Sequence, residues 1–90
     1  MKELLNKLTK LQEQGKLTCV IELKDSISVD TDEVNFYMSI DENKYKVVAD
    51  VFCGRITRMF ETFEEAIDFI LNTTEWDVTF SEDITDDWAW

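Results

Sequence analysis

The chain begins with leucines at helical spacing. Residues 2–14 carry one apolar stripe, made of Leu4, Leu5, Leu8 and Leu11. At 3.6 residues per turn these side chains share one face of a helix. Gly15 follows, and glycine is the usual residue in the left-handed turn that ends a helix. The pattern therefore predicts a helix over residues 2–14.

The pattern then changes to alternation. In residues 17–24 the apolar positions are every second one, which is typical of a strand with one buried face. The side chains predicted to point inward are Leu17, Cys19, Ile21 and Leu23. Residues 25–33 are mostly polar and are predicted to form a loop.

Two more alternating segments follow. Residues 34–40 are predicted to point Val34, Phe36, Met38 and Ile40 inward, and residues 45–53 to point Tyr45, Val47, Ala49 and Val51 inward. Between them, residues 41–44 read Asp-Glu-Asn-Lys and suit a hairpin turn. Residues 55–60 are predicted to form a fourth strand or an extension of the third.

A capping box predicts a second helix. Thr62 and Glu65 stand three residues apart before an apolar run, so a helix is predicted from Thr62 to about residue 72. Its apolar face comprises Phe63, Ala66, Ile67, Ile70 and Leu71. Residues 76–80 alternate again and suggest a short strand, and residues 81–90 form an acidic tail.

These segments predict an α+β fold. The order is α-β-β-β(β)-α-(β), with a small antiparallel sheet of three or four strands, an N-terminal helix and a helix in the C-terminal half. Residues 1–80 are predicted to be one domain and residues 81–90 its tail.

The predicted outward face of the sheet is unusually apolar. It would carry Val20, Tyr37, Val48 and Phe52, which is too much apolar surface for a face in contact only with water. Three explanations are open: helices cover both faces, the tail folds back, or a partner docks there.

Composition narrows the chemistry. The 90 residues include no histidine, two glycines and two cysteines, Cys19 and Cys53. Histidine-dependent nucleophiles and glycine-rich phosphate loops are therefore excluded, and the isolated cysteines are expected to be buried small apolar residues. The sequence contains no run of about 18 apolar residues of the kind that spans a membrane. The chain is predicted not to be an enzyme and to need no cofactor.

A metal site is not expected either. The segment 30–33 reads Asp-Thr-Asp-Glu, which resembles the start of a calcium-binding loop. It lacks the glycine and the later bidentate glutamate that such a loop requires.

Charge is distributed very unevenly along the chain. Residues 1–24 hold five lysines against three glutamates, a net charge of +2, whereas residues 25–90 hold four basic against 17 acidic residues, a net charge of −13. From Glu61 to Trp90 there are ten carboxylates and no basic residue. Such a surface repels nucleic acid and attracts a basic protein.

Carboxylates recur at helical spacing in this acidic half. A row at intervals of three and four residues places charges about 5–6 Å apart, a length scale comparable with that of phosphates along nucleic acid. The residues predicted to bind a partner by charge are Glu61, Glu65, Asp68, Glu75, Asp77, Glu82, Asp83, Asp86 and Asp87. The alternative is a solvated helix face without a partner.

The tail ends in two tryptophans. Trp88 and Trp90 are two residues apart, so an extended tail would place both on one side. They either anchor a partner or pack on the protein's own sheet.

The order of elements and the acidity resemble those of small phage anti-CRISPR proteins that inhibit type II RNA-guided nucleases. The segments 2–14, 17–24, 34–40, 45–53 and 62–72 would fill the helix–three strands–helix places of that group. The resemblance implies an inhibitor in the bacterial host cytoplasm that mimics nucleic acid and occludes the arginine-lined DNA site of such a nuclease. The alternative is an assembly or interaction module that uses the apolar sheet face.

Overall fold

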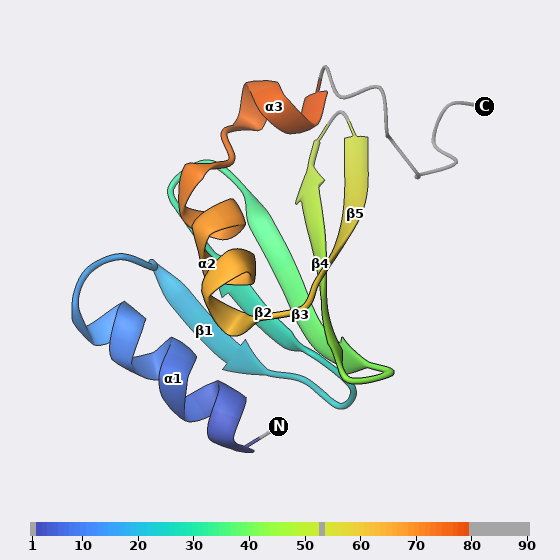
Figure 1. Cartoon of the computed structure of the whole chain (residues 1–90). Coiled ribbons are helices and arrows are strands. Elements are labelled where there is room, and N and C mark those ends of the chain that lie inside the picture. The colour runs from blue at the N-terminus through green and yellow to red at the C-terminus, as the bar shows by residue number, and fades with distance from the viewer. Residues whose placement is uncertain (1, 53, 80–90) are drawn as a thin grey trace.

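The fold is an antiparallel sheet with three helices (Figure 1). The computed structural model describes residues 2–52 and 54–79. In chain order the elements are α1 (Lys2–Glu13), β1 (Cys19–Glu22), β2 (Ile27–Asp30), β3 (Asn35–Asp41), β4 (Lys44–Val51), β5 (Gly54–Phe60), α2 (Phe63–Asn72) and α3 (Glu75–Thr79). The predicted α+β class is confirmed, and the sheet has five strands where three or four were predicted.

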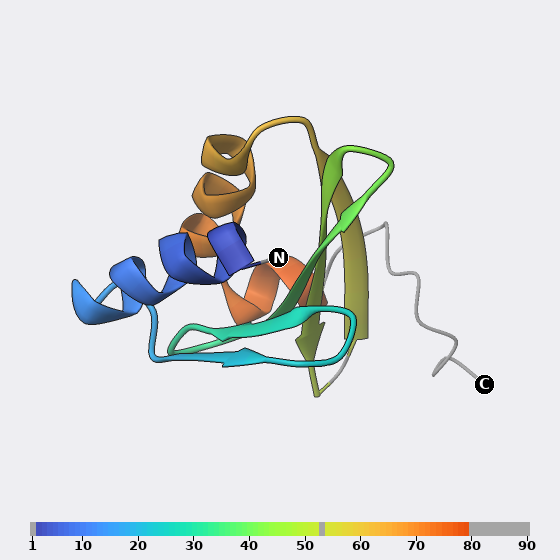
Figure 2. The same ribbon diagram turned by 90° about the horizontal axis from the view of Figure 1, so that it is seen from below.

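The sheet is a simple meander. Each strand pairs antiparallel with the next, so the spatial order equals the chain order. Figure 2 shows β1 and β2 turned away from β4 and β5, which makes the sheet strongly curved, with the helices on its concave side. α1 contacts β1, whereas α2 and α3 contact β4 and β5. Of the three explanations for an apolar outward face, helices on both faces is therefore wrong for the described residues, since their helices share one face.

The core lies between the concave face and the helices. The strands contribute Ile27, Val29, Phe36, Met38, Val47, Ala49 and Ile56, and the helices Leu4, Leu8, Ala66, Ile70 and Val78. Aromatic rings join α2 to the sheet, because Phe69 meets Phe36 edge-on at 6.1 Å between centroids and Phe60 at 5.3 Å. The core thus holds α2 in a fixed orientation, which determines what its other side presents to solvent.

Both predicted helix ends are confirmed. Gly15 has a φ of +80°, and the Gly15 and Lys16 N–H groups donate to the carbonyls of Gln12 and Leu11, each at 3.0 Å. This pair of bonds is the Schellman arrangement at the end of α1. At the start of α2, the Glu65 N–H donates to Thr62 Oγ1 at 3.1 Å, as the capping box predicts.

The predicted β3–β4 hairpin is also confirmed. Asp41 pairs with Lys44, which leaves a two-residue turn at Glu42 and Asn43. These residues have φ of +52° and +68°. Two positive φ values are the requirement of the turn type whose twist matches paired strands.

The strand β2 lies inside the segment predicted to be a loop. Ile27 and Val29 are fully buried, and the strand pairs on both sides, with β1 and β3. Only two apolar residues alternate in this four-residue strand, so neighbouring strands, and not its own pattern, determine it.

The phase predicted for the first strand is wrong. Val20 pairs with the buried Val29 and packs against the core, whereas Cys19 and Ile21 lie on the convex face. Ile21 and Leu23 are 51% and 42% exposed. Leu17 is buried as predicted, but it precedes the strand, and the alternation shifts by one residue between Leu17 and Val20. β1 is an edge strand with apolar residues on both faces, so its pattern fits either phase.

Cys19 is half-buried with a free thiol, so it is less buried than expected. Cys53 lies outside the described residues.

The strand predicted over residues 76–80 is also wrong, because Glu75–Thr79 is the short helix α3. The Asp77 carboxylate accepts hydrogen bonds from the Thr74 N–H and hydroxyl at 2.9 and 3.1 Å, and the Asp77 N–H donates to Thr74 Oγ1 at 3.2 Å. This reciprocal cap starts a helix where the local alternation alone suggested a strand.

Candidate acidic binding surface and the adjoining pocket

The outer side of α2 is a stripe of carboxylates. Its inner side buries Ala66 and Ile70 completely and packs Phe63 and Ile67 against the core. With that side fixed, residues three and four positions apart on the other side face solvent together. The exposed carboxylates there, with the one that precedes the helix, are those of Glu61, Glu64, Glu65 and Asp68, and we call them the α2 acidic stripe.

Two members of the stripe also have local structural partners. The Glu65 side chain accepts from the Thr62 hydroxyl at 3.1 Å, within the cap. Asp68 Oδ1 accepts from Asn72 Nδ2 at 2.9 Å. Each carboxylate retains a second oxygen and further lone pairs, so these bonds hold the side chains in place and leave them able to accept from a partner.

Glu75 and Asp77 do not continue this stripe along the same helix. α2 ends at Asn72, and Thr73 is extended, so both residues belong to α3. Asp77 caps α3 at Thr74. The Glu75 N–H donates to Glu33 Oε1 at 3.4 Å, which brings a residue of the β2–β3 loop beside α3. The structure thus adds Glu33 to the acidic surface, and no local pattern in the sequence indicates that long-range contact.

No ion pair between described residues neutralises the stripe. Across residues 2–52 and 54–79 the one salt bridge joins Arg55 to Asp50, with 3.3 Å between nitrogen and oxygen, on the other side of the sheet. The two nearby arginines in sequence, Arg55 and Arg58, belong to β5. In water, unpaired like charges at these spacings repel one another. A cation that approaches the stripe would offset this repulsion.

A tryptophan accompanies these carboxylates. Trp76 on α3 is 69% exposed and stands between Glu75 and Asp77 in the sequence. Because residues 76–80 were predicted to form a strand, Trp76 was not predicted to lie on a helix. The Thr74–Asp77 spacing is the signal that would have placed it on a helix. A large exposed aromatic side chain is a frequent anchor in protein interfaces.

Six of the residues predicted to bind a partner belong to the tail. Glu82, Asp83, Asp86, Asp87, Trp88 and Trp90 all lie outside the described residues. Of the predicted charged residues, the structure therefore positions Glu61, Glu65, Asp68, Glu75 and Asp77, and all five are exposed.

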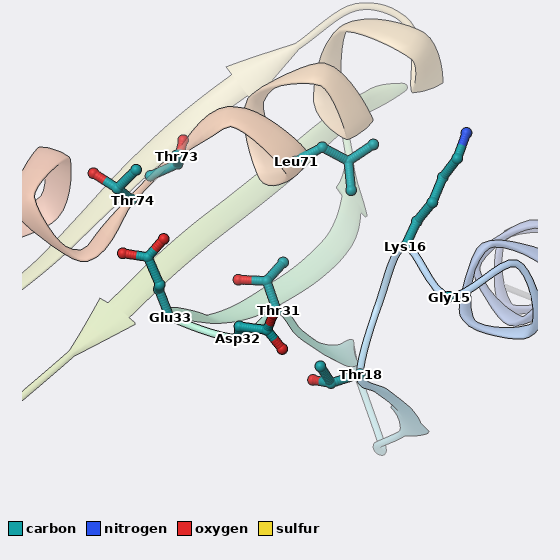
Figure 3. A pocket seen from close by; sticks show the side chains of 9 residues that line it. All are labelled: Gly15, Lys16, Thr18, Thr31, Asp32, Glu33, Leu71, Thr73 and Thr74. Carbon is teal, nitrogen blue, oxygen red and sulfur yellow. The ribbon is translucent and has the colours of Figure 1, made fainter.

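A polar pocket adjoins the acidic surface (Figure 3). Its cavity of about 210 Å³ lies where the α1–β1 connection, the β2–β3 loop and the α2–α3 junction meet. The lining residues are Gly15, Lys16, Thr18, Thr31, Asp32, Glu33, Leu71, Thr73 and Thr74. Figure 3 shows the Glu33 carboxylate directed towards Thr74, and the Lys16 amine directed away from both carboxylates.

One further carboxylate lies at the end of β2. Burial raises the pKa of Asp30 above its ordinary value of 3.8. Its Oδ1 atom has no hydrogen-bond partner within the described part of the chain. By register Asp30 shares the convex face with Asn35 and Asp50, so it is separate from the acidic surface of the helices.

The possible metal-ligand side chains of the described residues are scattered. These residues contain no group of three or more cysteine or carboxylate side chains placed to hold a metal ion. No helix among them is long and apolar enough to cross a membrane.

Comparison with known proteins identifies no relative. No family model, no curated protein and no solved structure matches the chain.

Proposed function

We propose that this protein is a non-enzymatic inhibitor that binds a basic, nucleic-acid-binding protein by imitating the charge of a nucleic acid. The observation that carries the proposal is the α2 acidic stripe. Its four carboxylates are exposed, lie on or just before a helix that packs on the core, and form no ion pair among the described residues. A site that normally pairs arginines with phosphates offers the complementary charge.

The candidate partner class follows from the same chemistry. RNA-guided nucleases read DNA through arginines in a positively charged channel. A net charge of −11 on 90 residues would steer association with such a channel and compete with DNA for it. Inhibition of this kind would take place in the cytoplasm of a bacterial host, without direct contact between this protein and nucleic acid.

The test uses two variants of equal charge. E61Q/E64Q/D68N removes three charges from the stripe but keeps the Glu65 cap, and E3Q/E13Q/E22Q removes three exposed charges from the N-terminal third of the chain. Both leave a net charge of −8, because each removes three of the 11 excess negative charges. Cleavage of target DNA by a guide-loaded type II nuclease would be measured with each protein added before the DNA.

The wild type and the N-terminal variant are expected to inhibit cleavage, and the stripe variant to lose at least about tenfold in potency, or about 1.4 kcal/mol. Inhibition should weaken steeply between about 0.1 and 0.5 M salt. Equal inhibition by the two variants would show that net charge, and not the stripe, is responsible. If no nuclease is inhibited, immobilised protein eluted with a salt gradient and with competing DNA would test other basic proteins.

A second candidate function is a protein-interaction module that uses the convex face. Described helices leave this face uncovered, and one row of paired residues crosses it: Ile21, Ser28, Tyr37, Val48 and Thr57. Ile21 is 51% and Met59 46% exposed. An apolar interface here would resist salt and be disrupted by Tyr37→Glu, whereas the stripe variant would leave it intact.

A further inference from the structure

The pocket beside α3 is built almost entirely from hydrogen-bond acceptors. A threonine hydroxyl has one proton to donate and two lone pairs. The Thr31 and Thr73 hydroxyls donate to the carbonyls of Val34 and Phe69 at 3.3 and 2.6 Å. Those protons are therefore already used inside the protein, and the oxygen atoms have only acceptor capacity to offer.

The remaining two threonines behave alike. The Thr18 hydroxyl donates to the Asp30 carbonyl at 3.0 Å, and the Thr74 hydroxyl donates to Asp77 Oδ2 at 3.1 Å. When they are ionised, the carboxylates of Asp32 and Glu33 can accept hydrogen bonds but cannot donate them. A group that enters this cavity must consequently supply the donors.

An anion does not fit these surroundings. Lys16 is the single cationic side chain among the residues that line the cavity, and Figure 3 shows its amine directed away from Asp32 and Glu33. Two carboxylates and four hydroxyls without free protons would repel a phosphate or carboxylate ligand.

The cation that fits best is a guanidinium. It carries five N–H donors in a planar fork, so it can reach acceptors on several segments at once, whereas an ammonium has three donors at one point. The acceptors here come from three separate segments of the chain. Leu71, which is 39% exposed, supplies an apolar wall against which the methylene stem of an arginine could pack.

We infer that this pocket is a binding site for a guanidinium group, and specifically for one arginine side chain of the basic partner. The source of the arginine rests on the proposed function, but the affinity of the pocket for guanidinium does not. Glu33 connects the two regions, because it lines the cavity and also accepts from the Glu75 N–H of α3. An arginine in the pocket would fix the register of the partner along the acidic surface.

The experiment is a titration of ¹⁵N-labelled protein with ethylguanidinium, with propylammonium and with neutral ethylurea, at constant ionic strength. Amide shifts of residues 31–34 and 73–75 report on the pocket. Ethylguanidinium is expected to bind with a Kd on the order of 1 mM or weaker, as befits so small a ligand. Propylammonium should bind several-fold more weakly, and ethylurea should cause no saturable shift.

Two double variants provide the control. D32N/E33Q removes the pocket charges but keeps an oxygen acceptor for the Glu75 N–H, and E22Q/D25N removes two exposed charges elsewhere. The first should weaken ethylguanidinium binding at least about tenfold, or about 1.4 kcal/mol, and the second should not. Equal binding by both variants, or equal shifts with ethylurea, would overturn the inference.

The outcome also separates this site from the proposed function. If D32N/E33Q inhibits the partner normally and neither it nor the wild type binds ethylguanidinium, the pocket inference fails while the acidic-stripe proposal stands. If ethylguanidinium saturates the pocket but no basic protein is bound or inhibited, the pocket is a guanidinium site and the proposed function fails.

Discussion

The helices α1 and α2 pack on the same face of the sheet but present opposite kinds of surface. α1 buries Leu4 and Leu8, and α2 buries Ala66 and Ile70. The outer side of α1 mixes signs, with Lys2, Glu3, Lys7, Lys10 and Glu13 exposed. α2 has no basic residue at all.

The difference shows that packing does not require an acidic exterior. On α1, Glu3 precedes Lys7 by four residues, an arrangement that stabilises a helix by about 0.2–0.5 kcal/mol. On α2, Glu64 precedes Asp68 by four residues, which destabilises by a similar amount. Lys7 also places its amine 5.0 Å from the centroid of the Phe63 ring, so even the contact between the two helices uses a cation from α1. The single sign of α2 is therefore a property of its surface and is independent of its fit to the core.

The largest expected effects test whether the two helices are equivalent in the core. Leu8→Ala and Ile70→Ala each truncate a fully buried side chain. Each should lower the free energy of unfolding by about 2–5 kcal/mol, because lost burial and a cavity add together. Urea denaturation followed by circular dichroism would measure both. A loss below about 1 kcal/mol for either variant would show that its helix does not pack as described.

Effects of intermediate size are expected at the helix ends. Gly15→Ala places a β-carbon at a φ of +80°, where nothing lies within 4 Å, so its cost of about 1 kcal/mol is conformational and not steric. Thr62→Ala removes the acceptor of the Glu65 N–H and should also cost about 1 kcal/mol. Gly15→Asn is the control, since asparagine tolerates this conformation and should cost less. Thermal unfolding would rank the three variants, and equal losses for alanine and asparagine would contradict the conformational explanation.

These helix ends were predictable because each depends on residues adjacent in the sequence. The same is true of the β3–β4 hairpin, where Asp41 to Lys44 suffice. β2 and the phase of β1 were not predictable in this way, since the inward side of Val20 is the one it shares with its cross-strand partner Val29, nine residues away.

The candidate site divides in the same manner. The stripe on α2 follows from helical spacing and was predicted in part. The contact of Glu33 with Glu75 spans 42 residues, and the pocket joins three distant segments, so neither has a local signature.

Two opposite charge substitutions, one on each helix, test the electrostatic difference between α1 and α2. Asp68→Lys would face Glu64 four residues earlier and complement the C-terminal half of α2, so it should stabilise the protein by about 0.5–1 kcal/mol. Lys10→Asp on α1 removes a cation from the last turn and should destabilise by a similar amount. Urea unfolding at about 0.05 and 0.5 M salt would measure both, and salt should shrink both differences. Asp68→Lys also removes the Oδ1 acceptor of Asn72, so Asp68→Asn, which loses the charge but keeps an oxygen acceptor, is the control. If neither variant stabilises, the stripe carries no electrostatic cost in the free protein.

The smallest expected effect concerns a carboxylate outside the stripe. Burial raises the pKa of Asp30 above 3.8, and its Oδ1 atom lacks a partner among the described residues. Because the folded pKa is the higher one, the contribution of Asp30 to stability is complete below pH 3.8 and is lost as the pH rises through the folded pKa. Asp30→Asn should therefore gain stability relative to the wild type as the pH is raised from about 3 to 7.

Asp25→Asn is the matched control for this comparison, because Asp25 is an exposed carboxylate in the β1–β2 turn. Its stability relative to the wild type should not follow the same pH course. Urea unfolding at several pH values would compare the two variants. A difference for Asp30→Asn that is constant with pH, or that falls as the pH rises, would show that Asp30 is not desolvated. In that case Asp30 on the convex face would be as well solvated as the carboxylates of α2. If the stability of Asp30→Asn relative to the wild type rises with pH, the negative charge of Asp30 opposes folding on the sheet. The carboxylates of α2, in contrast, are exposed to solvent.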